Sequence, residues 1–298
     1  MKLSVIVVSF NISTLLERCL TALIQQILQD QVEVLVVRDW QTHPDGLEPL
    51  QDQFSNVVWI NASQGATVPR MRYIGIQQSQ GEIIAFLEDD CVASPIWCAS
   101  IINAHRLPYI AIGGAVEPSA YKKGLDWGVY FCEYVRFMQP FQDEVQSLPG
   151  NNVSYKRTAL EPFLEDKSAT AGFYDVFIHQ SLQQSGHILR AETDLVVHNI
   201  NSWTLSHLMN VPFHHGRSFA GMRFADQAQW KRWLFAGIVP FLPWLQLSRI
   251  ARQVFTRQRY RLRLIRTLPE IFVFLTSWSI GELIGYVFGS GESLEQWR

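Results

Sequence analysis

The stretch GEIIAFLEDDC, residues 81–91, joins a short apolar run to three consecutive acids. The apolar part, Ile83 to Leu87, predicts a buried strand. Glu88, Asp89 and Asp90, here called the acid triplet, follow at the strand's C-terminal end, where open α/β sheets bind ligands. Their oxygens suit Mg²⁺ or Mn²⁺, which commonly complete their coordination with substrate phosphates. Taken alone, the segment is better explained as an acidic loop after a strand, because three acids in a row are common.

Apolar strand-like runs and helical spacings alternate around this stretch. Strands are predicted at residues 3–10, 32–37, 57–60, 83–87, 109–116, 153–155 and 187–197, and helices at 11–27, 69–78, 95–104 and in the second part of 172–185. Strands that alternate with helices predict an α/β fold with a Rossmann-like, mostly parallel sheet. Residues 117–150 are aromatic and predicted to be irregular.

Composition indicates a globular protein with two unlike regions. The 298 residues are 48% hydrophobic and 17% charged, which excludes bulk disorder. Residues 1–229 carry a net charge of −8, whereas residues 230–298 carry +6. The four cysteines lack the paired spacing of a zinc site and favour a reducing compartment.

The C-terminal region predicts membrane association. Residues 268–289 are apolar enough to cross a bilayer, yet Glu270 and Glu282 make a simple span costly. Residues 233–247 are apolar but interrupted by two prolines, and residues 248–266 carry seven arginines and no acid. We expect a helical hairpin in the membrane or a pair of interfacial helices, with the arginines facing anionic cytoplasmic headgroups. A buried helical subdomain is the alternative.

Parallel strands would bring other chemistry to the acid triplet. Ser9-Phe10-Asn11 ends the first strand and Asp39 follows the second, so both should share its edge of the sheet. Phe10 could stack on a nucleotide base, and Asp39 could accept a hydrogen bond from a base N–H. Core packing and a turn are the respective alternatives.

Taken together, SVIVVSFN (4–11), EVLVVRD (33–39), RMRYIG (70–75) and the acid triplet resemble the family 2 glycosyltransferases, which have the GT-A fold. The resemblance covers about residues 1–225 and implies a GT-A domain there, followed by a helical membrane-associating region at 226–298. The sequence departs from the family at Arg38, Tyr73 and Tyr174, which replace an acid, an asparagine and a glutamate.

The resemblance implies a donor site. Ser9, Phe10 and Asn11 would hold the nucleotide, and Asp39 would pair with uracil. Arg72 would contact the nucleotide or the pyrophosphate, with a surface ion pair as the alternative. The acid triplet falls on the DXD motif: Asp90 would bind Mn²⁺ or Mg²⁺, Glu88 would contact the ribose or the metal, and Asp89 belongs to the same donor-binding segment.

Later segments resemble the family's sugar and acceptor side. Asn151 and Asn152 lie in GNNVSYKR (150–157), which would line the site. Asp175, in GFYDVFI (172–178), falls on the general base, although such an aspartate is often only a helix cap. His198 is a candidate second metal ligand or a structural histidine. Residues 214–217 (HHGR) are predicted to be a flexible basic stretch that closes over phosphates.

The implied activity is an inverting transfer of a sugar from a nucleotide diphosphate, expected to be a UDP-sugar, to a glycan or lipid-linked acceptor. The enzyme would act at the cytoplasmic face of a membrane, without a nucleic-acid partner. Two alternatives stand beside it. One is a catalytically degenerate relative that binds nucleotide or glycan as an assembly partner. The other is a nucleotidyltransferase, which the missing glycine-rich basic loop after the first strand disfavours.

Overall fold

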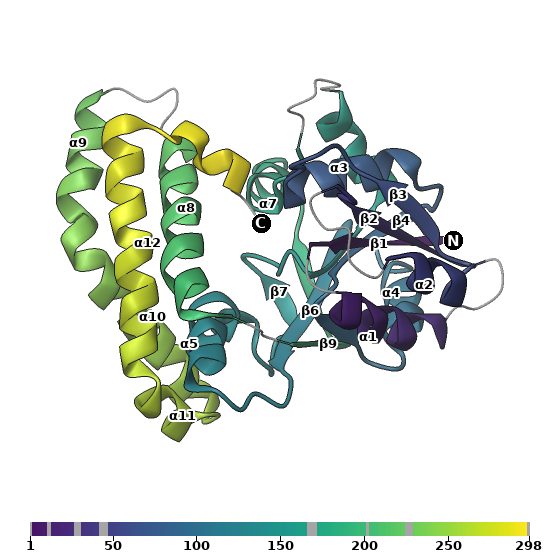
Figure 1. The fold of residues 1–298 in the computed structure, drawn as a ribbon, viewed down its shortest axis with the longest axis horizontal. Helices are drawn as coiled ribbons and strands as arrows, with labels where there is room; N and C mark the ends of the chain where they lie inside the picture. The colour runs from purple at the N-terminus through teal and green to yellow at the C-terminus, as the bar shows by residue number, and fades with distance from the viewer. Residues whose placement is uncertain are drawn as a thin grey trace. The chain divides into compact units, whose positions relative to one another are not determined.

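The computed structural model describes residues 2–10, 13–26, 31–41, 47–165, 172–200, 203–223 and 229–296. The chain forms two compact units (Figure 1). The first, an α/β unit, comprises Met1–Ser119 and Phe137–Ile200, and the second, a helical unit, comprises Ala120–Arg136 and Asn201–Arg298. The predicted boundary at residues 225/226 lies outside the described residues.

One mixed sheet organises the α/β unit. Its order is β3-β2-β1-β4-β8-β6-β9-β5, with β7 also paired to β9. The strands are β1 (Leu3–Ser9), β2 (Val32–Arg38), β3 (Val58–Asn61), β4 (Ile83–Glu88), β5 (Cys91–Ala93), β6 (Ala111–Pro118), β7 (Asp143–Val145), β8 (Asn152–Lys156) and β9 (Leu189–Asn199). The four strands from β3 to β4 are mutually parallel, whereas β8 pairs antiparallel with both neighbours. The predicted α/β fold is confirmed.

Continuous apolar runs put β1, β2 and β4 in the interior. Every residue of β1 is buried, as expected for a parallel strand covered on both faces. Helix α3 (Val68–Gln78) covers one face and α1 (Ser13–Ile24) the other (Figure 1). Gly75 lets α3 approach closely, because a Cβ there would lie 2.5 Å from Cγ2 of Ile6. This close packing fixes the start of α3, which carries Arg72, against the sheet.

The remaining helices of the α/β unit are short. They are α2 (Leu47–Gln53), α4 (Trp97–Ala104), α6 (Arg157–Leu160) and α7 (Asp175–Gln184), with a 3₁₀ helix at Glu161–Leu164.

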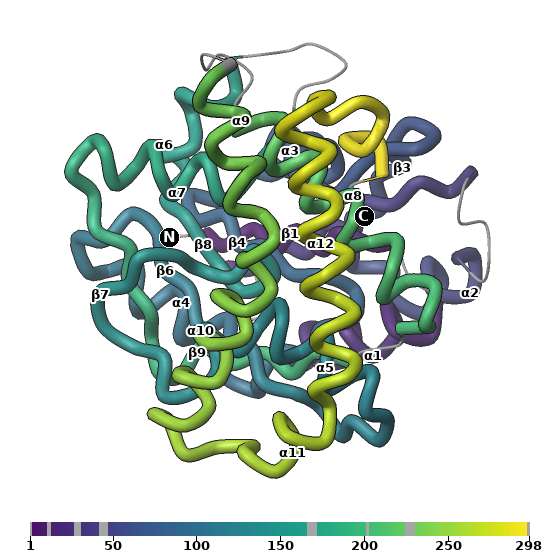
Figure 2. Tube along the Cα trace, turned by 90° about the vertical axis from the view of Figure 1, so that its left-hand side faces the viewer, coloured from purple at the N-terminus to yellow at the C-terminus, as the bar shows by residue number. Residues whose placement is uncertain are grey.

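The helical unit is built around α12. Its helices are α5 (Gly124–Glu133), α8 (Leu205–Arg223), α9 (Gln229–Ile238), α10 (Leu242–Arg257), α11 (Arg261–Arg266) and α12 (Leu268–Phe288), with 3₁₀ helices at Val135–Phe137, Val239–Phe241 and Gly291–Gln296. Figures 1 and 2 both show α12 alongside α9 and α10. The apolar stretch predicted at 268–289 is α12, and the predicted interruption at the prolines separates α9 from α10.

Glycines hold α8 and α12 together in a parallel pair. A Cβ at Gly216 would meet the carbonyl oxygen of Trp278, and one at Gly281 would meet that of Phe213. Such close backbone approach through small residues is typical of helix pairs in membranes. Glu282, predicted to be costly in a span, is buried beside this pair and accepts hydrogen bonds from Trp278 Nε1 (2.6 Å) and the Tyr286 hydroxyl (2.8 Å).

Two sequence predictions are wrong. Residues 117–150 are not irregular throughout, since they contain α5 and β7. The predicted flexible stretch at 214–217 lies inside α8, where Gly216 serves helix packing and not loop closure. In both places aromatic or glycine residues made a helical segment look irregular in the sequence. The stability of such a helix comes from tertiary packing, which the local sequence does not show.

Two segments are long and apolar enough to cross a membrane, by length and composition: Trp230–Arg257 and Leu268–Phe288. Less than half of the most apolar stretch of each segment is buried within the protein, 22% in the first and 44% in the second. Apolar side chains are therefore exposed on α9, α10, α12 and the 3₁₀ helix Val239–Phe241, among them Trp230, Trp233, Phe241, Trp244 and Phe288.

Candidate active site

Parallel pairing brings three strand ends to one edge of the sheet. Ser9 is opposite Arg38, and Val8 is opposite Glu88. The residues after β1, β2 and β4 therefore emerge side by side, as predicted from the sequence. Asn11 lies outside the described residues.

Asp89 anchors the turn after β1. Its Oδ2 accepts hydrogen bonds from the Ser9 hydroxyl (2.8 Å) and the Phe10 backbone N–H (3.0 Å), and Ser9 Oγ in turn accepts one from Arg38 Nη1 (2.8 Å). Asp89, Ser9 and Arg38 are all buried. A buried acid whose oxygen is hydrogen-bonded in this way stabilises the turn, and contact of Asp89 and Ser9 with the donor stays a prediction.

Asp39 organises the loop that follows β3. Its Oδ2 accepts a hydrogen bond from the backbone N–H of Gly65 (2.6 Å), and its Oδ1 accepts one from that of Gln41 (3.0 Å). Gly65 has a φ of +73°, a backbone conformation that glycine adopts without strain. The carboxylate thus fixes the end of β2 to this loop, and its contact with a base stays a prediction.

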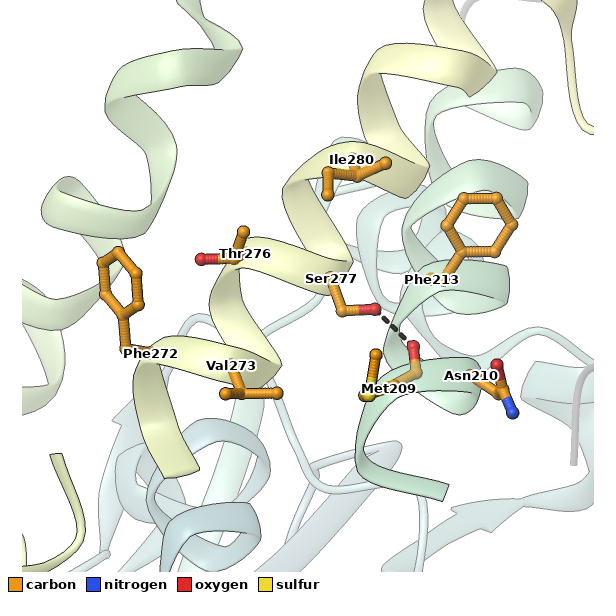
Figure 3. Close-up of a pocket in the computed structure, with 8 residues that line it drawn as sticks. All are labelled: Met209, Asn210, Phe213, Phe272, Val273, Thr276, Ser277 and Ile280. Atoms are coloured by element: carbon orange, nitrogen blue, oxygen red, sulfur yellow. Dashed lines mark hydrogen bonds between the residues drawn. The ribbon is translucent and has the colours of Figure 1, made fainter. Parts of the chain in front are cut away.

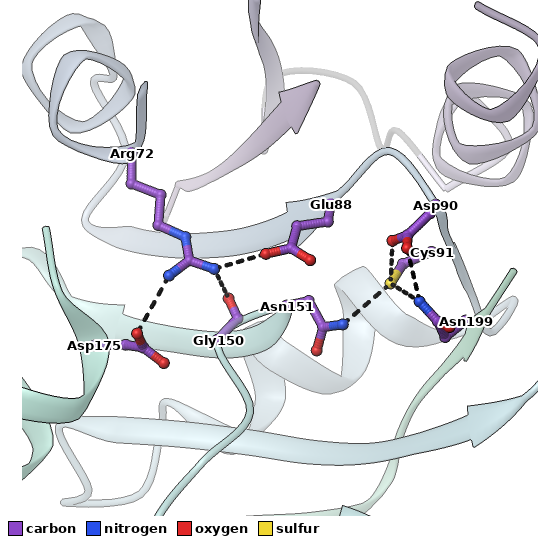
Figure 4. A network of polar contacts seen from close by, with 8 residues as sticks. All are labelled: Arg72, Glu88, Asp90, Cys91, Gly150, Asn151, Asp175 and Asn199. Atoms are coloured by element: carbon purple, nitrogen blue, oxygen red, sulfur yellow. Dashed lines mark hydrogen bonds and ion pairs between the residues drawn. The ribbon is translucent and has the colours of Figure 1, made fainter. Parts of the chain in front are cut away.

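Arg72 is the centre of a buried ionic network (Figure 4). Its Nη2 donates to Glu88 Oε1 (2.9 Å) and to the carbonyl oxygen of Gly150 (3.0 Å), while Nη1 lies 3.4 Å from Asp175 Oδ1. Arg72 is only 5% exposed, and its guanidinium lies 5.7 Å from the centre of the Phe86 ring. One fixed cation therefore joins the first acid of the triplet to the predicted base.

The start of α7 supplies Asp175. Asp175 is the first residue of that helix, where the partial positive charge of the helix N-terminus stabilises a carboxylate. Its side chain is 23% exposed, so it can meet a ligand. Gly150 keeps the space between Asp175 and Arg72 open, because a Cβ there would lie 2.7 Å from Asp175 Oδ2 and 2.8 Å from Arg72 Nη2.

Asp90 is held from β9. Its Oδ2 accepts a hydrogen bond from Asn199 Nδ2 (2.9 Å), its Oδ1 accepts a weaker one from the Cys91 thiol (3.3 Å), and its carbonyl oxygen binds the N–H of Ile200 (2.7 Å). Burial raises the pKa of Asp90 to about 8, and the charges of Glu88 and Asp89 add to the effect. Burial also raises the pKa of Glu88, against the opposing charge of Arg72.

The donor set of Asp90 and Glu88 fits a hard divalent cation. Both carboxylates lie at the sheet edge with little solvent. After burial, the charges of Glu88 and Asp89 raise the pKa of Asp90, and those of Asp89 and Asp175 raise the pKa of Glu88 against the opposing charge of Arg72. Mg²⁺ and Mn²⁺ take oxygen ligands and commonly use few protein carboxylates together with substrate phosphates. Within the described ranges no group of three or more His, Cys, Asp or Glu side chains is placed to hold a metal ion. The candidate protein ligands are therefore the two carboxylates of Asp90 and Glu88.

Two other predicted residues have different surroundings. His198 is exposed on β9, and the alternation of a strand sends its side chain to the face opposite that of Asn199, which binds Asp90. We therefore assign no metal contact to His198. Asn152 is buried in the core, where it donates to the carbonyl oxygens of Ala115 (2.9 Å) and Leu195 (3.1 Å) and accepts from Trp97 Nε1 (2.8 Å).

Asn151 differs from its neighbour Asn152. It donates to Cys91 Sγ (3.4 Å), and its buried Oδ1 has no hydrogen-bond partner among the described residues. A buried acceptor without a partner is uncommon and marks a place for a ligand donor such as a hydroxyl. Sequence reasoning missed Gly150 and Asn199 as site residues, although Gly150 opens the segment GNNVSYKR and Asn199 directly follows the candidate ligand His198.

Comparisons with known proteins agree with this architecture. Residues 4–164 match the protein family described as "Glycosyl transferase family 2". A glucosyl-dolichyl phosphate glucuronosyltransferase of Haloferax volcanii is 22% identical in a 182-residue alignment that covers 55% of this chain and 55% of that protein. The chain thus spans about half the length of this curated relative.

Two solved structures share the fold. The mannosyltransferase PcManGT from Pyrobaculum calidifontis, in complex with GDP-Man and Mn²⁺, superposes with a TM-score of 0.58 at 15% identity and covers 96% of this chain and 87% of its own. TarS from S. aureus, in complex with UDP-GlcNAc, has a TM-score of 0.50 at 14% identity, with 93% and 90% covered.

The matched family spans more than half of the chain, and so the chain belongs to glycosyl transferase family 2. The prediction of a family 2 glycosyltransferase with a GT-A fold is confirmed.

Proposed function

We propose that the protein transfers a sugar from a nucleotide diphosphate, expected to be a UDP-sugar, to a hydroxyl of a glycan or lipid-linked acceptor, with inversion at the anomeric carbon. The observation that carries the proposal is the Arg72 network, in which one guanidinium binds both Glu88 and Asp175. Such a transfer needs a base at the acceptor side, the proposed role of Asp175, and a group that neutralises charge at the diphosphate side, where Glu88 would help to hold a metal ion.

Asp175 is the proposed general base. The acceptor hydroxyl loses its proton to the Asp175 carboxylate as its oxygen bonds to the anomeric carbon and the bond to the diphosphate oxygen breaks. Arg72 holds the Asp175 carboxylate in one orientation at the N-terminus of α7. A positioned base of this kind contributes roughly 10²–10⁴-fold to the rate.

Asp90 and Glu88 are proposed to hold Mn²⁺ or Mg²⁺. When bound, the ion would neutralise negative charge on the diphosphate leaving group. Asn199 and Cys91 orient Asp90 for this role, and Arg72 orients Glu88. Phe10 and Asp39 lie at the adjoining strand ends, and we propose that they contact the nucleotide base. The Mn²⁺ and nucleotide sugars bound by PcManGT and TarS support this choice of cofactor and donor.

The helical unit supports a membrane-associated acceptor. α10 exposes Trp244 and Phe255 together with Arg249 and Arg252, which is the pattern of a helix that lies at a membrane interface. The Haloferax volcanii relative is named for a dolichyl phosphate substrate. We propose that the enzyme works at the cytoplasmic face, where anionic lipids attract arginine.

A donor screen tests the proposal. The purified protein is incubated with a panel of UDP-, GDP- and TDP-sugars, with Mn²⁺, with Mg²⁺ or with EDTA, and release of the nucleoside diphosphate is measured. We expect metal-dependent release from one class of donor. Release from none of the donors, or equal release with EDTA, would overturn the proposed reaction.

A further inference from the structure

A groove runs along the outside of the α8–α12 pair in the helical unit (Figure 3). Its volume is about 540 Å³. The walls are formed by Met209 and Phe213 from α8 and by Phe272, Val273, Thr276 and Ile280 from α12. A pocket of this size accommodates one small ligand or one chain, and not a whole two-chain lipid.

The lining of the groove is apolar. The Ser277 hydroxyl is occupied, since it donates to the carbonyl oxygen of Met209. Met209, Phe272 and Ile280 remain 53%, 44% and 48% exposed, so the groove is open to its surroundings. Glycine contacts between α8 and α12 give it a tightly packed floor. Two further polar residues line the groove: Asn210, whose Nδ2 donates to Ser206 Oγ (3.1 Å), and Thr276, whose buried Oγ1 has no hydrogen-bond partner among the described residues. The lining is otherwise apolar and favours a hydrocarbon.

Helix α10, which carries exposed arginines, packs against one wall of the groove. The Trp244 ring of α10 lies 5.6 Å from the Phe272 ring at the groove wall. Beyond it, arginines are exposed at positions 249, 252, 261, 263 and 266, and residues 242–269 contain no acid. Arg266 ends α11, and Phe272 lies in the first turns of α12, which begins at Leu268. An apolar groove that begins beside a cationic surface is complementary to an amphiphile with an anionic head.

We propose that this groove binds the single hydrocarbon chain of a lipid phosphate, the class of acceptor carrier that the proposed function calls for, with its phosphate at the α10–α11 arginines. The role of this ligand as the acceptor carrier rests on the proposed function, whereas its binding is inferred from the groove and the neighbouring arginines. A second copy of the chain fits less well, since two arginine-rich surfaces repel each other across a symmetric contact.

The test uses farnesyl monophosphate below its micelle concentration, with binding to the full chain measured by calorimetry. Ile280→Asp puts a charge at the groove, and Leu283→Asp puts the same charge on α12 at a similarly exposed position (39%) outside it. We expect Ile280→Asp to weaken binding about tenfold or more and Leu283→Asp to change it less than about twofold. Thermal unfolding of both variants verifies that they fold.

Three outcomes would overturn the proposal. They are equal affinity in the two variants, equal binding of inorganic phosphate, and a loss in Ile280→Asp that appears only with phosphatidylglycerol vesicles. The last would assign the groove to bilayer lipid. Metal-dependent donor hydrolysis is measured on the same samples: its absence from the wild-type protein counts against the proposed transferase, whereas its retention in Ile280→Asp beside lost farnesyl phosphate binding supports the groove.

Discussion

Gly150→Ala is a small change that tests how the base is positioned. The new methyl group would lie 2.7 Å from Asp175 Oδ2 and 2.8 Å from Arg72 Nη2, whereas ordinary contacts begin at 3.4 Å. Both charged groups must therefore move away from the methyl group, by roughly 0.7 Å for Asp175 and roughly 0.6 Å for Arg72. Since a misplacement of about 1 Å costs about 10²-fold, we expect kcat to fall about 10- to 100-fold.

The assay is steady-state transfer with the donor that the screen identifies. KM for the donor should change less than kcat, because Asp90 is not displaced, although Glu88 is bound to Arg72. Gly237→Ala is the matched control, since a Cβ there has no neighbour within 4 Å and should leave kcat unchanged. A kcat for Gly150→Ala within about twofold of the wild-type value would refute the reasoning that Arg72 and Asp175 act as one positioned unit.

Three further predictions concern the metal, the core and the membrane. Asp90→Ala should abolish metal-dependent donor binding in calorimetry, and undiminished metal dependence would count against this assignment. Burial lowers the pKa of His105 from 6.5 to about 3. The contribution of the neutral His105 to the free energy of unfolding is therefore fully present above pH 6.5 and is lost as the pH falls toward 3. His105→Gln should remove up to about 1.4 kcal/mol per pH unit of this dependence in urea titrations, and an unchanged slope would contradict it. Arg249→Glu with Arg252→Glu should reduce sedimentation with phosphatidylglycerol vesicles but not donor hydrolysis; sedimentation equal to that of the wild type would argue against an interfacial α10.

Much of the α/β unit could be predicted from periodicity. The apolar runs of β1, β2 and β4 are long enough to be buried on both faces, and parallel pairing then fixes where the acid triplet lies. The antiparallel insertion of β8 between β4 and β6 could not be read this way, because the strand pattern alone does not give the partner.

The site was predictable in outline but not in its contacts. The acid triplet marks the edge of the sheet, yet only the fold shows that Asp89 turns inward to Ser9 while Asp90 is held by Asn199. The Arg72 network likewise joins residues 78 and 103 positions apart in the chain. Long-range hydrogen bonds of this kind leave no local signal in a sequence.

The most direct test of the central claim compares Asp175→Asn with the wild-type protein. In the proposed mechanism Asp175 accepts the proton of the acceptor hydroxyl and does not bind the donor. We therefore expect kcat to fall about 10²-fold or more, while affinity for the nucleoside diphosphate with Mn²⁺ stays within about threefold of the wild-type value. Full transfer activity in Asp175→Asn, or a loss of nucleotide affinity as large as the loss of rate, would contradict the account.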